Sequence, residues 1–213
     1  MTTHALDGHE HVHGMPADTS TGLDSRKMAF WGFIGSECLL FGSLIATYMA
    51  YKGNSLNGPY PHDTVINGQH HEGILNIPLT SFSTFILLMS SVAMVMGLHF
   101  VQRGERNRAT LWLFLTAFFG SIFLGCQVFE FTHFYHEGLT LKSNLFGSTF
   151  YVLTGFHGAH VTVGVVYLLT LTWMSHRGRL PPRKALNVEI AGLYWHFVDV
   201  IWIVIFPLVY LVR

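Results

Sequence analysis

This sequence of 213 residues has few charged side chains, only two cysteines and no excess of either sign of charge. Asp, Glu, Lys and Arg make up 11% of it, and the 12 basic and 12 acidic residues give a formal charge of zero. A balanced chain has no basic surface for nucleic acid, so no nucleic-acid partner is expected. The two cysteines, Cys38 and Cys126, fall inside apolar runs and are interpreted as small hydrophobic side chains.

The sequence contains several long apolar runs. Half of the residues are hydrophobic, and 18 are phenylalanine. A helix that crosses about 30 Å of hydrocarbon needs roughly 20 apolar residues. Five runs meet this requirement, at about 27–51, 77–102, 109–136, 145–175 and 187–212. The predicted fold class is therefore an all-α integral membrane protein, a bundle of five transmembrane helices.

Basic residues alternate from loop to loop and predict the orientation. Nine lie on one side of the expected membrane, namely Arg26, Lys27, Arg103, Arg106, Arg108, Arg177, Arg179, Arg183 and Lys184. Lys52, Lys142 and Arg213 lie on the other. Cytoplasmic loops are enriched in Lys and Arg, so the N-terminus is expected in the cytoplasm and the C-terminus outside.

The chain divides into two parts. Residues 1–25 form a polar arm without the apolar stretch of a signal peptide, and it carries His4, His9, His11 and His13. Residues 26–213 form the five-span domain. Its longest connection, 52–76, is rich in Gly, Asn, Pro and His and is interpreted as a loop. Small residues at helical spacing, such as Ser121 with Gly125 and Gly155 with Ala159, are expected on faces where helices approach closely.

Ionisable residues inside the spans, together with one buried amide, are the candidate functional groups. The first span contains Glu37, and the later spans contain Gln127, Glu130, His133, His157, His160, Glu189, His196 and Asp199. Placing such a charge at the centre of a membrane costs at least about 2.5 kcal/mol, so each needs a partner. The fourth and fifth spans are joined by a short loop. Their polar faces are therefore expected to meet in one interhelical network.

The spacing of these residues leaves three interpretations open. The first is a metal site: Glu130 and His133 have the Glu-x-x-His spacing of di-iron bundles, and His133/His136 and His157/His160 are His-x-x-His pairs. No second Glu-x-x-His copy exists, so no metal ligand is assigned. A proton or ion path is favoured by Glu37, a lone carboxylate at the centre of a span. The third is structural hydrogen bonding between helices. At the cytoplasmic rim, Arg103, Arg106 and Arg177 are candidates for lipid head-group contacts.

Several motifs in a fixed order resemble subunit III of the haem-copper oxidases, specifically the cytochrome c oxidase subunit III family. They are Ser-Glu at 36–37, Gln-x-x-Glu-Phe at 127–131, the segment 147–161 with its Phe-His-Gly-x-His, and Glu189 followed by Tyr-Trp-His-Phe-Val-Asp-Val at 194–200. The similarity extends from about residue 24 to the C-terminus. The first two helices of the longer family form are missing, as in short bacterial members.

The resemblance implies an accessory subunit of a proton-pumping oxidase in aerobic electron transport, in a bacterial plasma membrane. It implies no cofactor in this chain, because haem and copper belong to partner subunits. Subunit I is the expected direct partner, with subunit II and small or additional subunits in the same complex. Bound phospholipids, a role in proton uptake and a role in the durability of the complex are also implied.

Three alternative functions are compatible with the same residues. The quinol-oxidising relatives also have five spans, but they tend to carry Asp in place of Glu37 and a different aromatic residue before Trp195. The cytochrome c branch is therefore preferred. A stand-alone proton or ion transporter built on Glu37 and Glu130 is the rival from a different class. A di-iron oxygenase is the third.

Overall fold

The computed structural model describes residues 25–52, 64–66, 69–71, 73 and 75–212. Within them, five helical segments are long and apolar enough to cross a membrane. The helices are α1 (Ser25–Tyr51), α2 (Ile77–Gln102), α3 (Arg106–His136), α4 (Leu145–His176) and α5 (Ala185–Phe206). A short 3-10 helix, Pro182–Lys184, precedes α5, and a π-helical turn, Pro207–Leu211, follows it. The prediction of five helical spans is confirmed. The histidines of the N-terminal arm lie outside the described residues.

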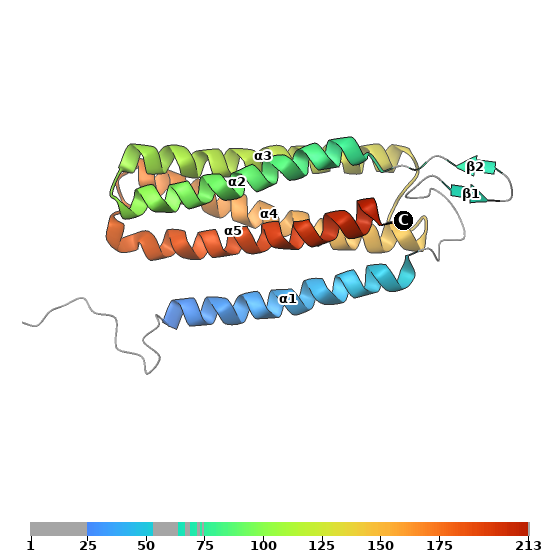
Figure 1. The fold of residues 1–213 in the computed structure, drawn as a ribbon, viewed down its shortest axis with the longest axis horizontal. Coiled ribbons are helices and arrows are strands. Elements are labelled where there is room, and N and C mark those ends of the chain that lie inside the picture. Colours follow the sequence, from blue (N-terminus) through green and yellow to red (C-terminus); the bar gives the residue numbers. More distant parts are fainter. Residues whose placement is uncertain (1–24, 53–63, 67–68, 72, 74, 213) are drawn as a thin grey trace, which may run out of the picture.

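The connection between α1 and α2 contains two short strands that the sequence analysis did not anticipate. Strand β1 (Thr64–Ile66) pairs antiparallel with β2 (Gln69–His71), with Thr64 opposite His71. Both strands lie at the end of the bundle that also holds the C-terminus (Figure 1).

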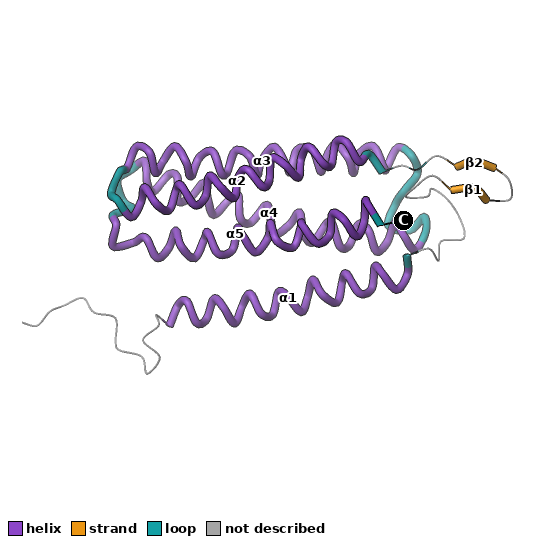
Figure 2. Tube along the Cα trace, in the orientation of Figure 1, coloured by secondary structure: helices purple, strands orange, loops and turns teal. Residues whose placement is uncertain are grey.

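Helices α2, α3, α4 and α5 form a four-helix bundle, and α1 lies outside it, against α4 and α5 (Figure 1). The beginning of α1, the α2–α3 turn and the α4–α5 turn share one end of the molecule (Figure 2). Of the residues of α1, just Phe41 and Tyr48 are buried. Little of α1 is therefore covered by its own chain, and Phe41 reaches rings of both α4 and α5.

The helix ends follow from local sequence. Side-chain oxygens of Asn76 and Asn144 accept hydrogen bonds from the backbone N–H groups of Leu79 and Gly147, which caps α2 and α4. Glycines with positive φ follow three of the helices: Gly104 (74°), Gly138 (83°) and Gly178 (68°). A left-handed glycine after the last helical residue lets the chain reverse without a steric penalty. These caps make the tight turns that keep α2–α5 antiparallel.

Trp195 of α5 lies at the centre of the bundle and is fully buried. Its indole N–H donates a hydrogen bond to Ser90 Oγ on α2 at 2.8 Å. A Cβ placed on Gly120 of α3 would come within 2.5 Å of the ring, and one on Gly164 of α4 within 2.8 Å. The tryptophan therefore fits between two helices because glycine faces it from both.

The two glycines of the pairs expected at close helix approaches do not approach another helix of this chain. A Cβ on Gly125 or on Gly155 would meet no atom of this chain within 4 Å. Close approach occurs at Gly120 and Gly164, and also at Gly158. The physical reason is that each of these three faces a large side chain of a neighbouring helix, which their spacing along the chain does not reveal.

Candidate functional site

Glu37 on α1 is paired with an imidazole of α4. Its Oε2 lies 3.0 Å from Nε2 of His160, and the side chains of Glu37 and His160 are 15% and 17% exposed. The other ring nitrogen of His160 lies 2.8 Å from the carbonyl oxygen of Phe156. A carbonyl oxygen only accepts, so Nδ1 must carry a hydrogen. One further proton then lies between Nε2 and Oε2, and the two residues share it. Glu37 is therefore not the lone carboxylate that the sequence suggested.

Two more polar contacts attach the ends of α1. At its beginning, Lys27 Nζ lies 2.6 Å from Glu189 Oε1 on α5. Just after its end, Lys52 Nζ donates to the carbonyl oxygens of Leu208, at 3.1 Å, and Val212. Burial lowers the pKa of Lys52. With the Glu37–His160 pair, α1 thus has a polar contact near each end and one near its middle.

The two polar residues of α3 contact different neighbours. Gln127 donates from Nε2 to the carbonyl oxygen of Thr154 on α4 at 2.9 Å. Glu130 accepts a hydrogen bond from Thr80 Oγ1 on α2 at 2.8 Å, and the Tyr210 hydroxyl also hydrogen-bonds to it. Glu130 is 5% exposed. It therefore connects α3 to α2 and to the C-terminal turn.

His157 of α4 is fully buried among aromatic rings. It stacks on Trp202 of α5 with ring centroids 4.7 Å apart, and it meets Phe123 of α3 edge-on at 5.9 Å. Neither ring nitrogen has a hydrogen-bond partner among the described residues. In this position the imidazole acts as a packing element between three helices.

His196 and Asp199 of α5 contact α2. Ser91 Oγ lies 2.8 Å from Nδ1 of His196 and donates a short hydrogen bond to Oδ2 of Asp199. Asp199 is 3% exposed, and its Oδ1 has no hydrogen-bond partner within the described part of the chain. These three residues form a second polar cluster in the middle of the spans.

The structure does not join the predicted polar residues into one α4–α5 network. His160 and Glu189 contact α1, His196 and Asp199 contact α2, and Gln127 and Glu130 connect α3 to its neighbours. The sequence analysis missed the partners Lys27, Thr80, Ser91 and Tyr210. Hydroxyl residues at 80, 84 and 91 share one face of α2 at helical spacing, and this signal was available.

The candidate metal ligands of α3 do not converge. His133 and His136 are both exposed near the end of this helix. Across the described ranges, no group of three or more His, Cys, Asp or Glu side chains is arranged to hold a metal ion.

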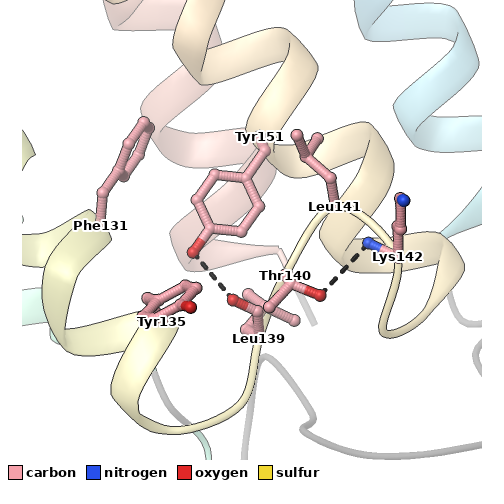
Figure 3. Close-up of a pocket in the computed structure, with 7 residues that line it drawn as sticks. All are labelled: Phe131, Tyr135, Leu139, Thr140, Leu141, Lys142 and Tyr151. Atoms are coloured by element: carbon pink, nitrogen blue, oxygen red, sulfur yellow. Dashed lines mark hydrogen bonds between the residues drawn. The ribbon is translucent and has the colours of Figure 1, made fainter.

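Two pockets lie between α3 and α4, one near each end. The pocket drawn in Figure 3, of about 350 Å³, is formed by Phe131 and Tyr151 with Lys142 nearby, and the Tyr151 hydroxyl donates to the Leu139 carbonyl at 3.1 Å. The pocket at the other end, of about 510 Å³, contains Phe114 and Trp173.

The predicted lipid-binding arginines lie at the same end as this second pocket. Arg106 donates to the carbonyl oxygen of His176, Arg177 lies over the Trp173 ring at 5.2 Å, and Arg103 is exposed. Arg106 and Arg177 therefore flank an apolar groove with cationic groups.

Taken together, five apolar spans and internally paired polar residues define a multi-pass helical membrane protein. Residues 11–212 match the family model described as cytochrome c oxidase subunit III. Quinol oxidase subunit 3 of Bacillus subtilis (strain 168) is 35% identical, over 86% of this chain and 85% of its own length. Cytochrome c oxidase subunit 3 of Bacillus sp. (strain PS3) is 36% identical, over 88% of this chain and 86% of its own. The chain therefore belongs to the cytochrome c oxidase subunit III family: it is the third subunit of a haem-copper oxidase, of cytochrome c or quinol type.

Proposed function

We propose that the chain is the accessory third subunit of a proton-pumping cytochrome c oxidase. In this proposal it has no redox centre, packs against subunit I, and supports proton uptake and the durability of the complex during turnover. The observation that supports the proton role is the Glu37–His160 contact, in which a carboxyl group and an imidazole share one proton near the middle of the spans.

Lipid binding is the second part of the proposal. An apolar groove beside Phe114 and Trp173 can accept an acyl chain, while Arg106 and Arg177 lie close enough to its end to attract an anionic head group. Arg103 adds a further positive charge at the same end.

The basic end of the bundle is proposed to face the cytoplasm of a bacterial cell. The beginning of α1, which carries Arg26 and Lys27, lies at that end together with the α2–α3 turn and the α4–α5 turn (Figure 2). This grouping agrees with the enrichment of Lys and Arg on the cytoplasmic side of membranes. Bacillus and Staphylococcus relatives support a bacterial plasma membrane.

Purification from native membranes tests the proposed function. We expect the tagged chain to copurify with haem-bearing subunits, and the complex to oxidise reduced cytochrome c in preference to quinol. Relatives named for each donor have nearly the same identity to this chain, so the donor assay decides between the two types. A complex that oxidises quinol alone would replace the cytochrome c assignment. A chain that purifies without haem and moves protons by itself in liposomes would instead establish a transporter.

Chemical labelling tests the role of Glu37. Carbodiimides add to protonated carboxyl groups, so a hydrophobic carbodiimide should modify Glu37, which shares a proton with His160 inside the membrane. Glu189 is the internal control, because it is 36% exposed and paired with Lys27. We expect mass spectrometry to locate the adduct on Glu37, with little on Glu189, and Glu37→Gln to slow proton uptake by the complex. Equal labelling of both residues, or unchanged uptake in the variant, would contradict the proposed role.

A further inference from the structure

The outward face between α2 and α5 carries a polar cluster at the middle of the membrane. Asp199 is buried, whereas Ser91 and His196 are partly exposed, so the cluster extends from the core to the surface of the bundle. Exposed apolar side chains lie one turn away: Val95 on α2 (55% exposed) and Val200 on α5 (56% exposed). We call Ser91, Val95, His196, Val200 and Ile203 the α2–α5 face.

The hydrogen bonds fix which nitrogen of His196 is free. Ser91 has one hydroxyl proton, which it donates to Asp199. It can therefore only accept from His196, so Nδ1 of His196 carries the hydrogen of that 2.8 Å contact. In a neutral imidazole the other nitrogen, Nε2, is then an acceptor. The hydrogen bonds of the described residues include none to Nε2 of His196.

Lipid is a poor match for such a group. Hydrocarbon offers no hydrogen-bond donor, and an unpaired polar group there is costly. Other polar side chains exposed on the spans avoid this cost within their own helix: Ser36 donates to the Phe33 carbonyl and Thr170 to the Val166 carbonyl. His196 differs from them, because it is partly exposed and its Nε2 acceptor has no hydrogen bond among the described residues.

We propose that the α2–α5 face is the docking surface for a transmembrane helix of another subunit of the same oxidase. The partner helix presents a hydrogen-bond donor to Nε2 of His196 and packs apolar side chains against Val95, Val200 and Ile203. This inference rests on the proposed function, since it takes the chain to be part of a multi-subunit oxidase.

Replacing His196 with leucine tests whether lipid or another subunit covers the α2–α5 face. In lipid, His196→Leu loses the contact with Ser91 inside this chain but breaks no contact with another subunit, so retention of the partner should be unchanged. At a protein interface it removes an interhelical hydrogen bond, and we expect roughly fivefold less haem-bearing partner retained per chain. The matched control is Thr170→Leu on α4, which removes an exposed polar group that is bonded to its own helix and should leave retention unchanged. Undiminished retention in His196→Leu would overturn the proposal.

Photocrosslinking provides a test that does not depend on the stability of the variant. The photoreactive residue benzoylphenylalanine is placed at Val200 in the intact complex, and at Val166 on α4 as a control of matched exposure (56% and 59%). We expect the Val200 adduct to be a transmembrane peptide of another oxidase subunit with a donor side chain at this depth. Adducts with phospholipid, with a second copy of this chain or with nothing would each overturn the docking surface. Copurification of haem in the same preparation shows separately whether the proposed function holds.

Discussion

Leucine in place of Gly120 is expected to prevent a stable bundle from forming. Its Cβ alone would lie 2.5 Å from the Trp195 ring and 2.9 Å from Val165. The ring has no room to move, because Gly164 brings the α4 backbone close to it on another side and Ser90 holds its N–H. Overpacking a core costs about 1–3 kcal/mol and more when the neighbours cannot shift. We expect an effect at or above the upper end of this range, measured as lost yield and a lowered midpoint of thermal unfolding.

Gly125 on the same helix is the matched control. A Cβ added there would meet no atom of this chain within 4 Å, so Gly125→Leu should fold and insert like the unmodified chain. If Gly120→Leu and Gly125→Leu have the same yield and the same unfolding midpoint, Trp195 does not fill the space between α3 and α4 as described.

The spans were predictable because hydropathy is summed over some twenty residues and tolerates local exceptions. The partners of single polar residues were not. His157 and His160 are three residues apart, and this spacing rotates them by about 60° around a helix. That rotation is enough to turn His157 to the Trp202 ring in the core and His160 to Glu37 on α1. Spacing within one helix defines a face, but it does not say which helix lies opposite.

The position of α1 explains the largest difference from the expected network. A short α4–α5 loop correctly predicts that these helices are neighbours, and the Tyr194 hydroxyl of α5 does donate to the His160 carbonyl of α4 at 3.0 Å. However, α1 lies against the same pair of helices and takes both His160 and Glu189 as partners. The connection from α1 to α2 is long, so chain order gave no indication of where α1 packs.

Replacing Glu130 with leucine is expected to loosen the C-terminal end of the bundle. Its carboxylate is the acceptor through which Thr80 of α2 and Tyr210 of the C-terminal turn are tied to α3. Thr80 keeps a second acceptor, the Asn76 carbonyl at 2.9 Å, and the buried Tyr210 hydroxyl keeps Thr80 as a partner but loses the carboxyl group. Losing a hydrogen bond costs about 0.5–1.5 kcal/mol, and more when the acceptor is charged. The variant should therefore unfold at a lower temperature and release its C-terminal residues faster to carboxypeptidase.

The variant Glu130→Gln distinguishes the contribution of the hydrogen bonds of Glu130 to stability from the contribution of its charge. Glutamine keeps a carbonyl oxygen where Thr80 and Tyr210 donate, so we expect it to retain most of the stability and to protect the C-terminus. Should glutamine prove as damaging as leucine, the negative charge of Glu130 would matter more than its acceptor oxygens. That outcome would move Glu130 from a structural link to a candidate ion-binding carboxylate, as the transporter interpretation requires. If both variants behave like the unmodified chain, Glu130 does not hold the C-terminal turn.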